Sequence, residues 1–150
     1  MDHKTNEVHK SLTIKQNIHK AFDIWTNYIH LWWPKNHRLS KDPTSKVILE
    51  ARANGRFYER TNDHAEFEYG TVELCEPPHH LIMSWYMGSH QDLPSKVDIR
   101  FTELSKGLTK LDIIHTGPEH LGEMWWQLVA KFEASWTQIL AAFENALPGL

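Results

Sequence analysis

The chain contains one cysteine, Cys75, among its 150 residues. A disulfide bond within the chain is therefore excluded, and a reducing compartment is expected. The first residues include no apolar run of the kind that forms a signal peptide, so we expect a cytoplasmic protein. No segment has the roughly 20 consecutive apolar residues that a membrane-spanning helix needs.

An excess of positive charge is also missing. The chain has 16 Lys and Arg residues against 19 Asp and Glu residues, for a formal net charge of -3. Binding to nucleic acid or to an anionic membrane generally requires a basic face, so we expect neither partner. Hydrophobic residues make up 41% of the chain, enough for one core. We expect a flexible N-terminus over residues 1–6 and a single domain over residues 7–150.

Catalytic signatures are absent as well. The sequence has no Gly-x-Ser-x-Gly, phosphate loop, dinucleotide fingerprint or His-Glu-x-x-His, so no cofactor and no metal are expected. The residues His115, Glu119, His120 and Glu123 are of types that bind metals, but their spacing matches no recognised signature. A solvated helix start is the preferred interpretation of this group.

Tryptophan, in contrast, is abundant, with 7 residues. Indole rings are large and carry a polar N–H group, so this number indicates a large core or an aromatic-lined pocket.

The first third of the chain predicts a strand followed by short helices. Apolar and polar residues alternate from Glu7 to Ile14, as in a half-buried strand. Asn17 is suited to cap a helix that begins at Ile18. A second helical piece from Tyr28 to Trp33 ends before a proline.

A series of antiparallel strands follows, because the connections between the segments are too short for crossovers. Asn54-Gly55 is a strong hairpin signal, Gly70 predicts a bulge or bend, and residues 88–94 are expected to form a loop. The expected strands are Val47 to Glu50, Arg56 to Arg60, Glu66 to Cys75, Leu81 to Met87, Lys96 to Glu103 and Leu108 to His115.

The last element is expected to be one long helix. Thr116 and Glu119 have the spacing of a capping box, and apolar residues recur every three or four positions from Leu121 to Leu147. Its apolar stripe needs a large partner, and the sheet is available. The sequence thus predicts an α+β helix-grip fold: a curved antiparallel sheet of about six or seven strands, two short helices, and a long C-terminal helix packed across the sheet, enclosing a cavity.

Several short segments, in this order and spacing, resemble a known family over about Val8 to Leu147. The segments are Ala21 to Trp25, Trp32-Trp33-Pro34, Gly55 to Tyr58, Gly70-Thr71-Val72, Glu76-Pro77-Pro78, Leu81 to Trp85, Val97 to Thr102, His115-Thr116-Gly117 and Trp136. The chain resembles the START-like (SRPBCC) superfamily, in the branch named for homology to the activator of the heat-shock protein 90 ATPase. Asn54 and Ser135 stand where that family usually has glycine, and neither change threatens the fold.

The resemblance implies a cavity that binds lipids, hormones or aromatic metabolites, as in the wider superfamily, of which a few branches are polyketide cyclases. We expect the cavity wall to include Trp32, Trp33, Tyr58, Tyr69, Trp85, Phe101, Trp125, Phe132 and Trp136, with His115 as a polar contact. Two of these predictions also have a purely structural alternative: the Trp32-Trp33 pair plugs the open end of the sheet, and His115 bonds the loop at Thr116 and closes the sheet end. Arg56, Tyr58 and Arg60 share one strand face, which points either into the cavity or to solvent.

Three functions remain open at this stage. The first is non-enzymatic binding of a small apolar or aromatic molecule between the C-terminal helix and the sheet. The second is an accessory role with the heat-shock protein 90 chaperone, although the namesake carries an additional N-terminal domain for which this chain has no room. The third is a cyclase-like or hydrolase-like enzyme with His115 as acid or base. We expect a monomer or a homodimer.

Overall fold

Seven strands of the described chain form a single antiparallel sheet in the order β1-β7-β6-β5-β4-β3-β2. The computed structural model describes residues 6–150, except for the side chains of Pro118 and His120. The elements are β1 (Glu7–Ile14), α1 (Ile18–Thr26), the single turn η1 (Ile29–Leu31), β2 (Lys46–Leu49), β3 (Arg56–Arg60), β4 (Glu66–Glu76), β5 (His80–His90), β6 (Leu93–Ser105), β7 (Leu108–Thr116), α2 (Pro118–Leu121), α3 (Glu123–Ala146) and η2 (Leu147–Gly149).

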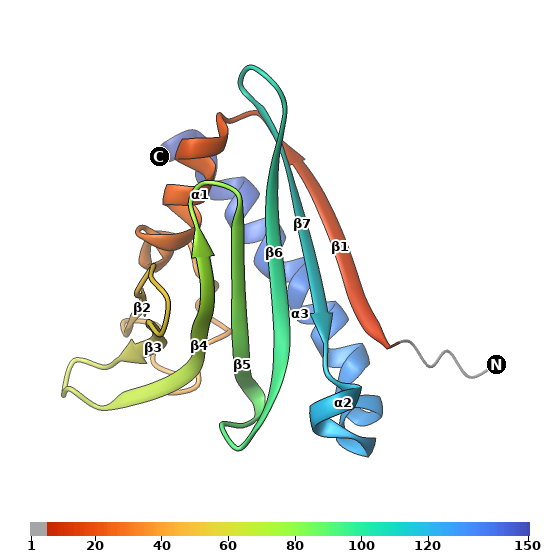
Figure 1. The fold of residues 1–150 in the computed structure, drawn as a ribbon. Coiled ribbons are helices and arrows are strands. Elements are labelled where there is room, and N and C mark those ends of the chain that lie inside the picture. Colours follow the sequence, from red (N-terminus) through yellow and green to blue (C-terminus); the bar gives the residue numbers. More distant parts are fainter. Residues whose placement is uncertain (1–5) are drawn as a thin grey trace.

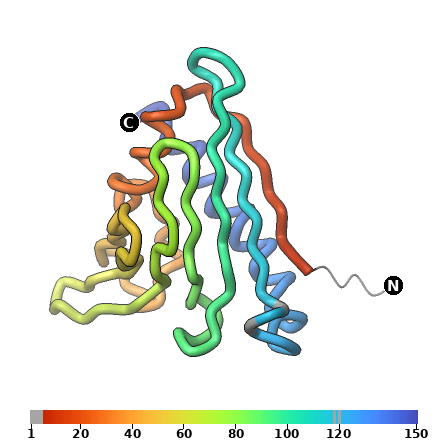
Figure 2. The backbone as a smooth tube through the Cα atoms, viewed as in Figure 1, coloured from red at the N-terminus to blue at the C-terminus, as the bar shows by residue number. Residues whose placement is uncertain are grey.

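The helices cover one face of the sheet. Figure 1 shows α3 running diagonally behind the strands, with its C-terminal end near α1. The ring centroids of Trp25 in α1 and Phe143 in α3 are 5.0 Å apart, so these two helices meet over the sheet. The backbone trace in Figure 2 shows the strands crossing in front of α3. The predicted helix-grip architecture is therefore confirmed.

The core lies between α3 and the inner face of the sheet. Alternate residues of β5, β6 and β7 point toward the helix, including Leu81, Met83, Val97, Ile99, Leu111 and Ile113, all buried. From α3, the buried residues are Trp125, Phe132, Trp136, Ile139, Leu140 and Phe143, spaced at three or four positions as a single apolar face requires. The helix is thus held by apolar burial along its length.

The local signals in the first half are also confirmed. Asn17 caps α1 by accepting a hydrogen bond from the Lys20 backbone N–H at 2.8 Å. Next to Gly70, the pairing of β3 with β4 shifts by one residue at Tyr69, which is the expected bulge. A side chain at Gly70 would lie 2.2 Å from the Ser84 carbonyl oxygen, so only glycine permits this close approach of strands.

Two expectations about element boundaries are wrong. The expected loop over residues 88–94 is replaced by a longer hairpin, in which His90 of β5 pairs with Leu93 of β6. The last helix is not continuous, because Gly122 adopts φ 55° and ψ -128° between α2 and α3. Thr116 is the last residue of β7, and α2 begins two residues later at Pro118, so Thr116 does not stand directly before the helix. The apolar spacing could not show this break, since Leu121 and Trp125 remain four residues apart across it.

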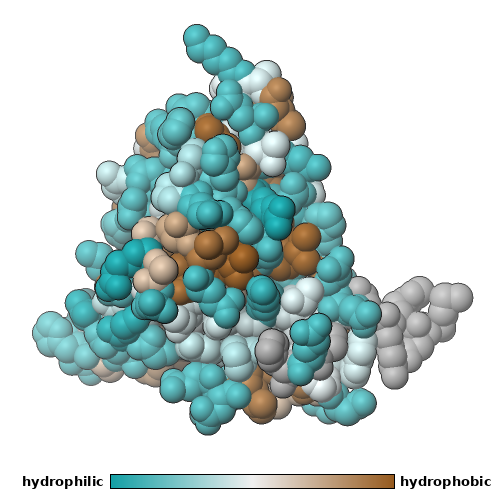
Figure 3. All heavy atoms as spheres, in the orientation of Figure 1, coloured by the Kyte–Doolittle hydropathy of each residue, from teal (hydrophilic) through white to brown (hydrophobic). Residues whose placement is uncertain are grey.

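The outer face of the sheet is mostly hydrophilic, with a small apolar area over the middle strands (Figure 3). Strand pairing places Leu74, Ile82 and Ile114 in one cross-strand row on this face, interrupted by Asp98, and all are half-buried. Within the described residues, no helix has the length and apolar character required to cross a membrane. Of the expected flexible segment 1–6, residues 1–5 lie outside the described part.

Candidate functional site

Aromatic side chains fill most of the space between α3 and the sheet. Trp33 contacts Phe57, Tyr69 and Trp85, and Trp85 in turn contacts Trp136 with ring centroids 5.1 Å apart. Trp125 and Phe132 continue this series along α3. The central part of the expected cavity is therefore occupied by the residues that were expected to line it.

His115 lies at the centre of this aromatic cluster and is fully buried. The Trp136 indole N–H donates to His115 Nδ1 at 2.9 Å, which makes Nδ1 the acceptor and leaves the proton on Nε2. Nε2 then donates to the Ser95 hydroxyl at 2.6 Å, and that hydroxyl donates to the Trp85 carbonyl at 3.4 Å. Both ring nitrogens are thus occupied within the protein.

The protonation state of His115 follows from this burial. Removal from water lowers the pKa of His115 from 6.5 to about 3, because a buried imidazolium would lose its hydration. The ring is neutral at physiological pH. Both nitrogens of this neutral imidazole bond to neighbouring side chains, which orients Trp136 and Ser95 within the aromatic cluster.

An open pocket of about 190 Å³ remains beside this cluster. It lies between residues 36–39, the second half of β5 and the middle of α3. The lining residues are Asn36, His37, Arg38, Leu39, Trp85, Met87, Gly88, Lys131, Phe132, Ser135, Trp136 and Ile139.

The strand and helix periods explain how the pocket wall forms. Trp85 and Met87 are two residues apart in β5 and therefore face the same side. Phe132, Ser135 and Ile139 fall on one face of α3. Gly88 has φ 85°, and a side chain there would lie 3.2 Å from the Phe132 ring. Glycine therefore allows β5 to approach Phe132 closely at this point of the wall.

The remaining wall is the segment that follows the Trp32-Trp33 pair. The Trp33 indole N–H donates to the His37 carbonyl at 2.9 Å, and the Trp32 indole N–H donates to the Ile24 carbonyl at 2.9 Å. The Asn36 amide donates to Gln138 of α3 at 3.3 Å. The tryptophan pair thus anchors a polar segment against the helix and places it over the pocket.

A network of buried hydrogen bonds centred on Glu59 holds the residues that follow this segment. The Glu59 carboxylate, fully buried, accepts hydrogen bonds from the Ser40 N–H and hydroxyl, the Ser45 hydroxyl and the Tyr69 hydroxyl, at 2.6 to 2.9 Å. Burial raises the pKa of Glu59, but these four hydrogen bonds outweigh it and the net pKa is lowered. Burial and the neighbouring carboxylate raise the pKa of Tyr69, so its hydroxyl stays protonated.

Arg38 joins this polar system to the pocket. Its guanidinium donates from Nη1 to the Ser45 carbonyl and hydroxyl and from Nη2 to the Trp33 carbonyl at 3.2 Å. Because Ser45 also donates to Glu59, the two buried charges are connected through one hydroxyl. The Nε–H of Arg38 has no hydrogen-bond partner among the described residues.

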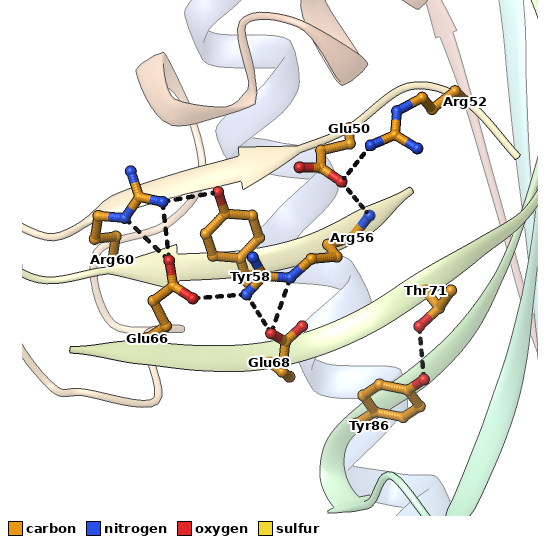
Figure 4. Close-up of polar contacts among 9 residues, drawn as sticks. All are labelled: Glu50, Arg52, Arg56, Tyr58, Arg60, Glu66, Glu68, Thr71 and Tyr86. Atoms are coloured by element: carbon orange, nitrogen blue, oxygen red, sulfur yellow. Dashed lines mark hydrogen bonds and ion pairs between the residues drawn. The ribbon is translucent and has the colours of Figure 1, made fainter. Parts of the chain in front are cut away.

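Tyr58 was expected in the cavity wall, and the structure places it on the opposite face of the sheet. The alternation of β3 sends Phe57 and Glu59 inward, so Tyr58 points outward with Arg56 and Arg60 (Figure 4). The Arg56 guanidinium lies 3.8 Å from the Tyr58 ring centroid and pairs with Glu66 and Glu68. Arg60 pairs with Glu66 at 2.9 Å. The alternative in which this face is solvated is therefore the observed one.

Of the other expected site residues, three reach the pocket: Trp85, Phe132 and Trp136. Trp33, Tyr69 and Trp125 lie in the aromatic cluster behind it, whereas Trp32 and Phe101 pack around Trp25. Sequence analysis missed Met87 and Ile139, which period-two and helical spacing from Trp85 and Phe132 would have identified. It also missed Arg38, for which an isolated polar loop gave no signal.

The histidines and acidic residues gather into no metal site within the described residues. In the group considered from the sequence, the side chain of His120 lies outside the described part. His80 instead bonds Asp98 at 2.9 Å on the outer face of the sheet.

The curved sheet packs against one long helix, and an aromatic pocket lies where they meet. This arrangement defines a helix-grip protein. The chain belongs to the activator of Hsp90 ATPase homolog 1-like protein family, whose model matches residues 15–147. The family to which the sequence was compared is thereby confirmed. No curated protein matches the chain.

Solved structures share the fold. DynU16, a protein of the dynemicin biosynthetic locus, is 14% identical with a TM-score of 0.70; the match covers 97% of this chain, which spans only 48% of DynU16. The anthrahydroquino-gamma-pyrone synthase Txn09, solved in complex with a ligand designated SUM, is 25% identical with a TM-score of 0.64, covering 97% of this chain and 99% of that one. PFC0360w, an HSP90 activator from Plasmodium falciparum, is 18% identical with a TM-score of 0.68, covering 96% and 97%.

Proposed function

We propose that the protein binds a small, flat, largely aromatic molecule in the pocket between residues 36–39, β5 and α3. The observation that carries this proposal is the wall itself: Trp85, Phe132 and Trp136 line an open space beside a polar segment. Ligand pockets commonly combine apolar walls with a few placed polar groups.

The volume limits the size of the ligand. The pocket measures about 190 Å³. Pockets for drug-sized ligands usually measure about 300–1,000 Å³. A ligand of one or two fused rings fits this space, whereas a lipid or a sterol exceeds it. The structural neighbour Txn09, which was solved with a bound ligand, shares the fold over nearly its whole length and supports the same use of the interior.

The test uses calorimetric titration with small aromatic probes and a blocked pocket. Ser135 lies on the pocket wall, and the Ser135→Phe side chain would fill the space. The matched control is Thr137→Phe, two residues away on the exposed side of α3. The proposal predicts saturable binding of at least one fused-ring probe that Ser135→Phe abolishes and Thr137→Phe retains. Equal binding by all three proteins, or no binding to the unmodified chain, would overturn it.

A second candidate function is contact with the Hsp90 chaperone. It is favoured by the family to which the chain belongs and by the fold shared with the activator PFC0360w. The test is the ATPase rate of the purified chaperone with and without this chain. A concentration-dependent change in rate supports this function, and an unchanged rate with no complex by analytical ultracentrifugation removes it. The same centrifugation distinguishes a monomer from a homodimer.

A further inference from the structure

The pocket wall includes a histidine whose backbone is firmly held. His37 lies in the segment that covers the pocket, and it is partly exposed. Its backbone N–H donates to the Pro34 carbonyl at 3.1 Å, and its own carbonyl accepts from the Trp33 indole N–H at 2.9 Å. These contacts fix the residue without involving its imidazole ring.

The hydrogen bonding of the His37 ring identifies the nitrogen that carries the proton. Burial lowers the pKa of His37, so the ring is neutral near pH 7 and carries one N–H group. Nδ1 lies 2.9 Å from the Asn36 Oδ1 atom, and the Asn36 amide nitrogen donates to Gln138 at 3.3 Å. Because an amide oxygen only accepts, Nδ1 is the donor and Nε2 keeps its lone pair.

The Nε2 atom of His37 remains available to a ligand. It has no hydrogen-bond partner among the described residues. Within that part of the chain, the buried side-chain polar atoms without a partner are Arg38 Nε and Ser89 Oγ, and Nε2 is not one of them. Nε2 is therefore an unpaired acceptor that solvent reaches, on a residue of the pocket wall.

Ser135 adds a second accessible polar group on the α3 side of the same pocket. Its hydroxyl also lacks a partner among the described residues and is not a buried atom. A hydroxyl both donates and accepts, whereas the neutral Nε2 only accepts. The charged residues of the wall are Arg38 and Lys131, and none of its described lining residues is acidic, so a positively charged ligand is disfavoured.

We propose that the ligand of this pocket is a hydroxylated aromatic molecule, a phenol or a naphthol, whose O–H group donates to His37 Nε2. This inference rests on the proposed function and adds the chemical class of the ligand. A phenolic hydroxyl suits both polar groups of the wall, because its hydrogen meets the free acceptor and its oxygen can accept from the Ser135 hydroxyl. An aromatic N–H group offers only the donor, and an ammonium group adds a charge that the wall disfavours.

The test compares two probes of nearly equal shape, naphthol and the corresponding fluoronaphthalene, by NMR titration of the full chain. Fluorine occupies the place of the hydroxyl group but has no hydrogen to donate. Naphthol should bind at least about threefold more tightly, as expected for one net neutral hydrogen bond. His37→Phe keeps an aromatic ring but removes the acceptor, so the preference should disappear. The matched control is His19→Phe, at an exposed position of α1, which should retain the preference.

A second measurement does not depend on the folding of the His37 variant. In the unmodified protein, the nitrogen resonance of His37 Nε2 should move far more with naphthol than with fluoronaphthalene, because only naphthol donates to the lone pair. Equal affinity for the two probes, with no such difference at Nε2, would overturn the hydroxyl assignment and leave the proposed function standing. A preference that survives in folded His37→Phe would also overturn it. If neither probe binds, both the proposed function and this inference fail.

Discussion

The indole N–H of Trp136 donates a hydrogen bond to Nδ1 of His115 over 2.9 Å, in a site that solvent does not reach. This bond fixes the histidine tautomer and also fixes the plane of the indole ring. Because the other side of Trp136 forms part of the pocket wall, the pair connects the packed core to the candidate binding surface.

The first prediction concerns the charge of His115. With a pKa lowered to about 3, the ring should show no titration between about pH 8 and pH 5, where an ordinary histidine with a pKa near 6.5 changes state. NMR chemical shifts of the imidazole check this directly. A midpoint near 6.5 for His115 would contradict the buried neutral ring.

The same pKa predicts the pH dependence of stability. The unfolded chain binds a proton on this histidine below about pH 6.5, whereas the folded chain does not until about pH 3. Stability must therefore fall as the pH decreases through this window, by about 1.4 kcal/mol per pH unit from this group alone. Urea unfolding of the unmodified protein and of His115→Gln, compared between about pH 7 and pH 5.5, measures the difference. An equal pH slope in both proteins would refute the prediction.

Removal of the donor in this pair should destabilise the protein. Trp136→Phe leaves the buried Nδ1 of His115 without its partner and leaves a small cavity, so we expect a loss of roughly 2–4 kcal/mol in the free energy of unfolding. Tyr28→Phe, at a residue that is 46% exposed, is the control and should change stability by less than about 0.5 kcal/mol. Equal losses in the two variants would show that the hydrogen bond to His115 contributes little.

Glu59 should be sensitive to loss of its charge. Glu59→Gln replaces one acceptor oxygen by a donor amide, which then faces either the hydroxyl groups of Ser40 and Ser45 or the Tyr69 hydroxyl and the Ser40 N–H. We expect a loss of about 1–3 kcal/mol by chemical unfolding. Because the pKa of Glu59 is lowered in the folded state, this loss should be present at neutral pH and diminish as the pH falls below the ordinary carboxylate range. Glu103→Gln, at an exposed position, is the control.

Tyr58 offers a test of which face of the sheet is used. Tyr58→Leu removes the ring beneath Arg56 on the outer face and should leave the affinity for aromatic probes unchanged within about twofold. Stability should decrease by roughly 1 kcal/mol, as cation–π and partly exposed ion-pair networks are weak. Calorimetry measures the affinity, and thermal melting measures the stability. A large loss of affinity would place the binding site on the outer face instead.

The fold was predictable because its signals are periodic and local. Alternation in the strands, the Asn17 cap and the apolar stripe of α3 each depend on neighbouring residues, and the structure confirms all three. The break at Gly122 was missed because Leu121 and Trp125 keep the helical spacing on either side of it. Hairpin length beyond Met87 was missed because Ser89 and His90 have no apolar alternation.

The candidate site was only partly predictable. Trp85, Phe132 and Trp136 follow from the periodicity of their own elements, and all three reach the pocket. The direction of the Tyr58 side chain depends on which face of β3 is buried. The alternation of Phe57 and Glu59 with Tyr58 does not by itself identify that face. The position of Arg38 at the pocket depends on a long-range contact. Trp33 packs against Trp85 of the sheet, and Arg38 donates a hydrogen bond to the Trp33 carbonyl.

The most direct test of the binding site uses the indole N–H resonances of the 7 tryptophans as reporters in one NMR titration with naphthol. Trp85 and Trp136 line the pocket, whereas Trp25 and Trp32 pack at the α1 end of the core. The account predicts saturable shifts at Trp85 and Trp136 with little change at Trp25 and Trp32. Shifts confined to the Trp25 and Trp32 resonances, or no saturable shift at Trp85 and Trp136, would contradict it.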